Sequence, residues 1–168
     1  MQLVGSVLYG ADAHVARLVA SLLGGTQQPG FAYTADGRPY FSALGVVVDG
    51  VLIGGVVYHS FRPGRYGSDI EIAAAFANAR WCRRAVIAKL CAYPFVQLGC
   101  ARITARVARK NKRARRLIEF LIGSPTPEGI VKRGADGKQD AVLYGMTRDT
   151  CRWLKGDTHG KPATTHAA

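Results

Sequence analysis

Positively charged residues gather just before an apolar helical stretch near position 80 of the sequence. They are interleaved with one aromatic ring, in the order Arg80, Trp81, Arg83 and Arg84. The first turn of a helix already carries about half a positive charge, so arginines are unfavourable there unless an anion is bound. Free backbone N–H groups and guanidinium groups together hold phosphate-like anions. The pattern therefore indicates an anion site, with a solvent-exposed basic turn as the alternative.

Two carboxylates precede this turn in the stretch SDIEIAAAF, which alternates as a half-buried strand does. Asp69 and Glu71 then lie on one face of the strand, and Ile70 and Ile72 on the other. A carboxylate next to an anion site is a candidate general base. The simpler interpretation is that Asp69 and Glu71 pair with nearby arginines.

Positive charge is concentrated in one segment of the chain. The sequence has 23 Lys and Arg against 11 Asp and Glu, a net charge of +12, and no acidic residue lies between Glu71 and Glu119. Twelve cations fall in that interval, which equals the whole excess: Arg80, Arg83, Arg84, Lys89, Arg102, Arg106, Arg109, Lys110, Lys112, Arg113, Arg115 and Arg116. Such a field favours a polyanionic partner, either nucleic acid, a phosphorylated cofactor or an anionic surface. A solvated basic face is the alternative.

The first half of the chain predicts a helix and three strands around these residues. An amphipathic helix is expected over 11–23, ending at a Gly-Gly pair, and a loop over 26–42. Two β-branched runs within 44–59 flank Asp49-Gly50, a strong signal for a two-residue hairpin. The alternating strand 68–76 follows. A short strand is also expected at the start of the chain.

The second half predicts a helix from about 80 to 93 that stops before Pro94, because the residue before proline avoids helical backbone angles. A strand over 101–108 and an amphipathic, basic helix over 111–123 come next. A closing hairpin is expected around Asp136-Gly137. The order predicts one α/β (α+β) domain over 1–154 with a mixed sheet, followed by a disordered basic tail over 155–168.

Other classes of protein are disfavoured. No apolar run approaches the roughly 20 residues of a membrane span, and no secretory signal pattern is present. The four cysteines form no C-x-x-C pair and no metal-ligand spacing, which favours idle thiols in a reducing cytoplasm and no metal.

Element order and two motifs resemble the GNAT superfamily of acyl-CoA N-acyltransferases over roughly residues 11–150. The family's turn Q/R-x-x-G-x-G/A corresponds to Arg80–Ala85, with Arg83 at the central glycine. The family's N-x-x-A-x-x-L-Y corresponds to Asn111–Ile118, with Ile118 at the tyrosine. The layout, including the end YGMTRDTCRWL, looks most like small phage-encoded members.

This resemblance implies a mixed, splayed central sheet and an N-acyltransferase that uses acetyl-CoA or another acyl-CoA, with no metal. The acceptor amine is not identified. The anion would be the coenzyme A pyrophosphate. Cofactor contacts are expected from Ala73, Ala75, Arg80, Trp81, Cys82, Arg83, Arg84, Ala85, Asn111 and Arg115.

Catalytic roles are expected for Asp69 or Glu71 as base, and for Asn111, which is equally suited to cap a helix. Tyr144 is a candidate proton donor in place of the missing family tyrosine, with core packing as its alternative. His59 is interpreted as structural.

A second function remains open because the basic helix has more cations than coenzyme A needs. Surplus cations in one patch bind nucleic acid by releasing counterions. The candidate residues are Arg109, Lys110, Lys112, Arg113 and Arg116, within the basic segment 80–116. In this alternative the chain is a GNAT-like nucleic-acid-binding protein, or a DNA-base-modifying protein of the Mom type.

Overall fold

A computed structural model describes residues 5–25 and 30–155 of the chain, which has 168 residues. Seven strands form one sheet in the order β1-β2-β3-β4-β5-β7-β6. Their bounds are β1 Gly5–Leu8, β2 Ser42–Val48, β3 Val51–Arg62, β4 Ser68–Phe76, β5 Cys100–Ala108, β6 Gly129–Val131 and β7 Ala141–Thr147. The helices are α1 Asp12–Leu22, α2 Arg84–Ala92 and α3 Lys112–Ile122. The tail beyond residue 155 lies outside the described residues.

The local signals explain why these elements form. Asp49 and Gly50 have φ of 52° and 76°, the pair of positive values that a type I′ turn needs, and they join β2 to β3 as predicted. Asn111 caps α3, since its Oδ1 accepts the N–H of Ala114 at 3.0 Å. Gly123 ends α3 in the left-handed conformation.

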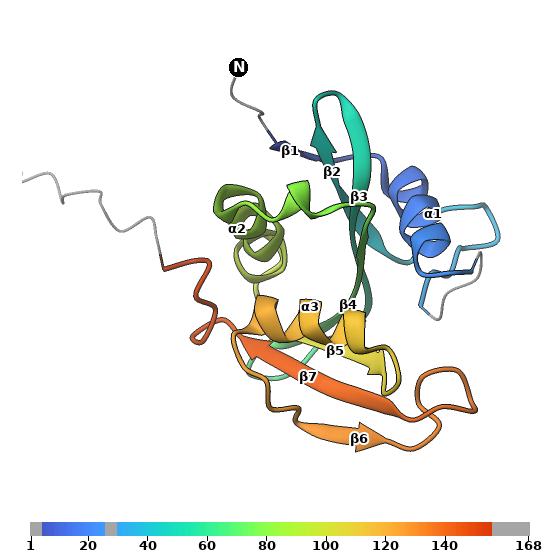
Figure 1. The fold of residues 1–168 in the computed structure, drawn as a ribbon, viewed down its shortest axis with the longest axis vertical. Coiled ribbons are helices and arrows are strands. Elements are labelled where there is room, and N and C mark those ends of the chain that lie inside the picture. The colour runs from blue at the N-terminus through green and yellow to red at the C-terminus, as the bar shows by residue number, and fades with distance from the viewer. Residues whose placement is uncertain (1–4, 26–29, 156–168) are drawn as a thin grey trace, which may run out of the picture.

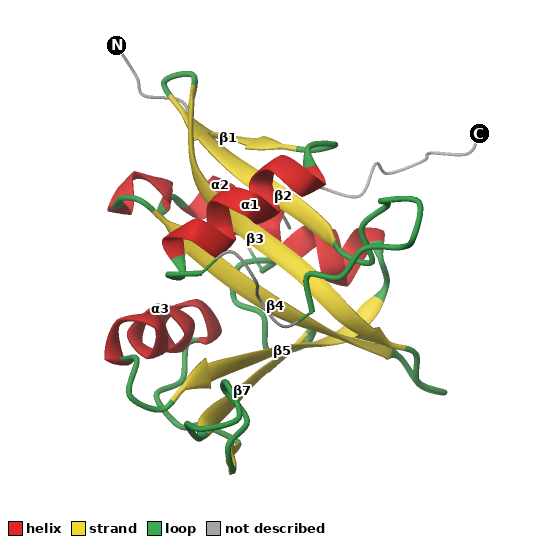
Figure 2. Ribbon diagram, turned by 90° about the vertical axis from the view of Figure 1, so that its right-hand side faces the viewer, coloured by secondary structure: helices red, strands yellow, loops and turns green. Residues whose placement is uncertain are grey.

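Helices cover both faces of the sheet, and a separate hydrophobic core lies between the sheet and the helices on each face. α1 packs on one face of β2–β4, where Val15, Val19 and Val57 are fully buried. α2 lies on the opposite face, as Figure 2 shows, and shares the larger core with α3. None of the helices among the described residues is long and apolar enough to cross a membrane.

The parallel pair β4 and β5 is splayed. Ladder pairing joins Ser68–Ile72 to Cys100–Ala105 and goes no further, although β4 continues to Phe76 and β5 to Ala108. Each strand keeps its antiparallel partner on the other side, β3 for β4 and β7 for β5. The two strands therefore diverge toward α3 (Figure 2). This confirms the predicted mixed, splayed sheet.

The helix predicted over 80–93 was wrong at both ends. A short 3-10 helix, Ala79–Trp81, comes first, and α2 begins only at Arg84. Beyond α2 the chain continues through Pro94 as a π-helix over Tyr93–Gln97, closed by the Leu98 N–H to the Tyr93 carbonyl at 3.0 Å. Proline is tolerated because it lies in the first turn of this segment, where its missing N–H has no required partner.

Candidate active site

The gap between β4 and β5 holds two adjoining cavities of about 500 and 340 Å³. Figure 1 shows α3 beside the splayed strands. Both cavities are lined by Leu23, Ala74, Asn111, Ala114 and Leu117, so they form one cleft along β4. The larger cavity lies near the point where the pairing of β4 with β5 ends, at Ile72 and Ala105, which we call the fork. The smaller cavity reaches the turn that leads to α2.

The β4 edge of the cleft offers backbone hydrogen-bonding groups to a ligand. Residues 73–76 have no ladder partner on the β5 side. Peptide groups alternate in direction along a strand, so part of this edge faces the cleft. The small side chains of the alanines at 73–75 leave room beside this strand edge for an extended ligand. Ala73 lines the larger cavity and Ala75 the smaller one.

The far end of the smaller cavity is formed by the turn between β4 and α2. Asn78, Ala79 and Trp81 line it. Trp81 is buried and stacks on Phe76, with ring centroids 4.3 Å apart and planes at 11°. Trp81 therefore acts mainly in packing, with one surface at the end of the cleft.

The start of α2 is open to an anion. Arg83 is its N-cap, and its side chain makes no capping hydrogen bond. Within the described part of the chain, the backbone N–H groups of Arg84, Ala85 and Val86 have no acceptor outside the helix. Arg83 has φ −121° and ψ 137°, extended angles that any residue adopts. The missing family glycine therefore costs no backbone strain at this position.

The arginine side chains around this helix start do not converge, contrary to the predicted cluster. Arg80 pairs with Asp49 at the tip of the β2–β3 hairpin. Arg84 reaches the Arg152 carbonyl at 3.4 Å and lies over the ring of Trp153. Arg80 and Arg84 thus have separate local partners, because the 3-10 turn and the helix point successive side chains in different directions. Arg83, Cys82 and Ala85 are exposed and do not line either cavity.

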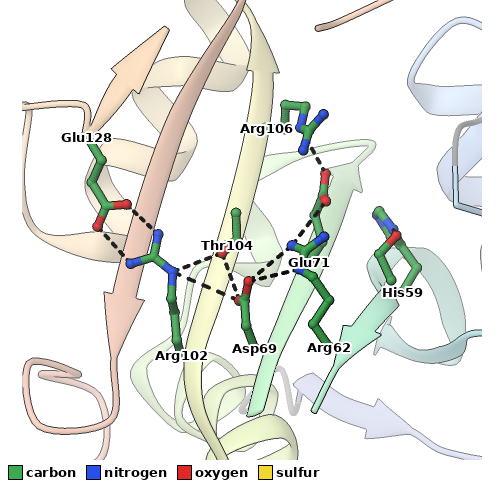
Figure 3. Close-up of polar contacts among 9 residues, drawn as sticks. His59, Arg62, Asp69, Glu71, Arg102, Thr104, Arg106 and Glu128 are labelled. Atoms are coloured by element: carbon green, nitrogen blue, oxygen red, sulfur yellow. Dashed lines mark hydrogen bonds and ion pairs between the residues drawn. The ribbon is translucent and has the colours of Figure 1, made fainter. Parts of the chain in front are cut away.

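At the opposite end of the cleft, the two predicted carboxylates have different surroundings (Figure 3). Asp69 accepts hydrogen bonds from Arg62 Nη2 at 3.0 Å and from the Thr104 hydroxyl at 2.8 Å. Arg102 donates to the same hydroxyl at 3.0 Å and also pairs with Glu128. Asp69 does not line either cavity. It belongs to a polar network that ties β3, β4 and β5 to the segment just before β6.

Glu71, by contrast, lines the larger cavity beside the fork. Its carboxylate is 3.6 Å from Arg62 Nη2 and 3.5 Å from Arg106 Nε, and its side chain is 12% exposed. His59 lies opposite Glu71 in the β3–β4 pair and lines the same cavity. The structure therefore brings a carboxylate, an imidazole and two guanidinium groups to one end of the cleft.

The remaining predicted residues divide between the cleft and the core. Asn111 caps α3 and also lines both cavities. Tyr144 is buried, donates to Glu119 at 2.6 Å and accepts from Arg115 Nε at 3.0 Å. Neither Tyr144 of β7 nor Arg115 of α3 lines the cleft. Their geometry does not support the predicted catalytic and cofactor roles.

The basic segment is less uniformly basic in space than in sequence. Acidic residues from elsewhere pair with Arg80, Arg102, Arg106, Arg109 and Arg115. Within the described residues, no ion pair forms at Lys110, Lys112, Arg113 or Arg116, all of them exposed. Arg113, predicted as a nucleic-acid contact, also lines the smaller cavity.

Sequence reasoning missed three groups at the fork: His59, Arg62 and Arg106. His59 and Arg62 stand on β3 and Arg106 stands on β5, so no single sequence motif joins the three residues. One signal was present, since His59 is a polar residue inside the apolar run VLIGGVVYH and a buried polar group in a strand needs a reason.

No protein-family model and no curated protein matches the chain. Solved structures do match its fold. A probable acetyltransferase matches with TM-score 0.51 and 24% identity over 65% of this chain and 63% of that protein. Mycobacterium smegmatis RimJ, solved with CoA-disulfide, matches with TM-score 0.52 and 20% identity over 68% of this chain and 59% of that protein. This chain therefore spans less than two thirds of either protein.

A fuller match is a mutant spermidine N-acetyltransferase, SpeG, from Vibrio cholerae. It aligns with TM-score 0.58 and 18% identity over 92% of this chain and 97% of that protein. At these identities the likeness concerns the fold. The chain has the mixed α/β fold of the GNAT acetyltransferases, as its sequence resemblance implied.

Proposed function

We propose that the protein is an acyl-CoA-dependent N-acyltransferase, with acetyl-CoA as the first candidate donor. The observation that carries this proposal is the cleft between β4 and β5, which runs from the turn before α2 to the polar groups at the fork. The chain shares its fold with acetyltransferases, and one of these was solved with CoA-disulfide.

The chemistry of the cleft fits each part of an acyl-CoA. Three backbone N–H groups at the start of α2 suit the pyrophosphate. The β4 edge over residues 73–76 suits the amide groups of pantetheine, as an added strand would. Arg113, at the rim of the smaller cavity, is the guanidinium best placed for a phosphate. The acyl end would then reach the fork beside Glu71 and His59.

Amide formation gains most from holding amine and thioester together and from stabilising the charge that develops on the acyl oxygen. Asn111 and the β4 edge hold the donor in this arrangement. Glu71 and His59 supply polar groups on the side where an amine would enter the larger cavity.

A matched pair of arginines on α3 tests the proposal. Arg113 lines the cleft, whereas Arg116, three residues further along the same exposed helix surface, does not. Losing one exposed charged contact to phosphate costs about 1–2 kcal/mol, so Arg113→Ala should raise the Kd of acetyl-CoA about 5- to 30-fold. Arg116→Ala should leave it within about twofold. Calorimetric titration measures both, and failure of the wild-type protein to bind acetyl-CoA or CoA at millimolar concentration would overturn the proposal.

Nucleic-acid binding is the second candidate, and one observation favours it. Lys110, Lys112 and Arg116 are exposed, lie close together in sequence and form no ion pair within the described chain. If this patch binds duplex DNA, log Kd should vary with log salt by about 0.9 per phosphate contacted. Arg116→Ala should then weaken DNA binding and flatten that slope while acetyl-CoA binding stays unchanged. Binding that does not depend on salt would reject this candidate.

A further inference from the structure

His59 occupies an unusual position for a histidine. It lies on β3 in the sheet interior, 6% exposed, and the ring of Phe31 packs edge-on against it at 5.8 Å. The imidazole nevertheless lines the larger cavity of the cleft together with Glu71. Because His59 is buried yet lines the cavity, its side chain is placed to touch a ligand there.

The backbone directly after His59 is irregular and forms a β-bulge. The β3–β4 register shifts between His59 and Arg62, and Ser60 has φ of 51°, which is strained for a residue other than glycine. Such bulges re-aim side chains and are frequent next to active sites. Here the Ser60 hydroxyl lies 2.9 Å from His59 Nδ1, and Arg62 turns toward Asp69 and Glu71.

The charged groups around His59 come from three strands and one loop. Glu71 faces it from β4, Arg62 from β3 and Arg106 from β5, and Asp136 lines the same cavity from the loop before β7. Burial lowers the pKa of His59, and the two arginines lower it further against the opposing effect of Glu71. These effects together favour the neutral imidazole over the imidazolium.

We propose that His59 is the group that accepts the proton of the acceptor amine in the acyl transfer. This inference rests on the proposed function. In the tautomer it requires, Nδ1–H donates to Ser60 Oγ, and Nε2 carries the lone pair that takes up the proton. Glu71, already paired with two guanidinium groups, orients the amine through a hydrogen bond and is not the base.

The step balances as follows. The amine nitrogen attacks the acyl carbon, the new C–N bond forms and the C–S bond breaks with its electron pair on sulfur. The nitrogen loses one proton to His59 Nε2. The thiolate of coenzyme A takes up one proton, which His59 can return directly or through solvent, so the products are the amide and the free thiol.

Site-specific carbethoxylation tests the placement without knowledge of the acceptor. Diethylpyrocarbonate reacts with neutral imidazole, and mass spectrometry separates His59 from the exposed His14 of α1, the internal control. We expect His59 to react with a pH midpoint below the ordinary imidazole value of 6.5, and saturating acetyl-CoA to slow its reaction at least tenfold while the reaction of His14 stays unaffected. An unreactive His59, a midpoint at or above 6.5, or no protection would overturn the proposal.

Kinetics tests the role itself. Acetyl-CoA turnover with a panel of primary amines, followed by product mass, should fall about 100-fold or more in His59→Gln, with little change in KM for acetyl-CoA. In the wild type, kcat should fall as the pH drops below about 6.5 (the acidic limb of the pH profile), because His59 becomes protonated. This fall should disappear in His59→Gln. Glu71→Gln should raise the amine KM and keep the limb. If His59→Gln retains wild-type kcat and its acidic limb, the proposal is overturned.

The two proposals fail in different ways. Acetyl-CoA binding is measured by calorimetry on the same wild-type sample, before carbethoxylation. Absence of binding overturns the proposed function. Binding without protection of His59 leaves the acyltransferase in place and overturns only the assignment of the proton acceptor.

Discussion

Arg84 allows the side chain and the backbone N–H of one residue to be tested separately. Its N–H is the first of the open donors at the start of α2, whereas its side chain lies over Trp153, outside the cleft. Arg84→Pro removes both, and Arg84→Ala removes the side chain alone. Proline is favoured at the first position of a helix. The preceding residue, Arg83, already has the extended angles that proline requires of its neighbour.

The expected effect follows from one lost hydrogen bond to a charged group. Such a bond contributes about 1.5–3 kcal/mol, which corresponds to roughly a 10- to 150-fold change in Kd. Arg84→Pro should therefore bind CoA at least tenfold more weakly than Arg84→Ala, and Arg84→Ala should bind nearly as well as the wild type. Calorimetric titration measures the three values, and thermal unfolding checks that α2 remains folded.

Equal Kd values for the proline and alanine variants would refute this reasoning, because the backbone of α2 would then make no contact with the pyrophosphate. A large loss in Arg84→Ala alone would be equally damaging. It would mean that the guanidinium leaves Trp153 and turns into the cleft when CoA binds.

Two further predictions concern groups outside the cleft. Tyr144→Phe removes the hydroxyl that joins Glu119 and Arg115, and should lower the free energy of unfolding by about 1–2 kcal/mol in urea titrations. Acetyl-CoA affinity should not change, and a specific loss of turnover would restore the proton-donor role predicted from the sequence. Glu128→Gln tests pH dependence, since the hydrogen bond from Arg102 lowers the pKa of Glu128 and its stabilisation is present at pH 7 but lost as pH falls. The variant should be less stable than wild type by under about 1 kcal/mol at pH 7 because the pair is exposed, and the difference should vanish in acid; a difference that grows below pH 4 would contradict the assignment.

The sequence predicted elements well where a local signal decides them. The Asp49-Gly50 turn, the Asn111 cap and the alternating strand before Arg80 each depend on a few neighbouring residues. The helix predicted from position 80 failed because periodicity does not distinguish a 3-10 turn from the first turn of an α-helix. Pro94 failed as a stop signal because a π-helix accommodates it.

The candidate site could be predicted only in part, since its chemistry depends on which strands become neighbours. Glu71 and Asp69 share one strand face, but only Glu71 lines the larger cavity, whereas Asp69 accepts a hydrogen bond from Thr104 in the polar network. The arginines near position 80 are adjacent in the sequence, but the side chains of Arg80 and Arg84 contact different partners. His59 gains significance only from its cross-strand neighbour Glu71.

Residue-resolved NMR tests the central claim most directly, namely that an acyl-CoA lies along β4 with its pyrophosphate at the start of α2. Amide ¹H–¹⁵N signals of the ¹⁵N-labelled protein are followed as acetyl-CoA is added. The largest shifts should fall on residues 73–76 of β4 and on residues 84–86 of α2, with a smaller group at the fork around Glu71. Shifts confined to the exposed basic surface of α3, with β4 and α2 unmoved, would contradict it.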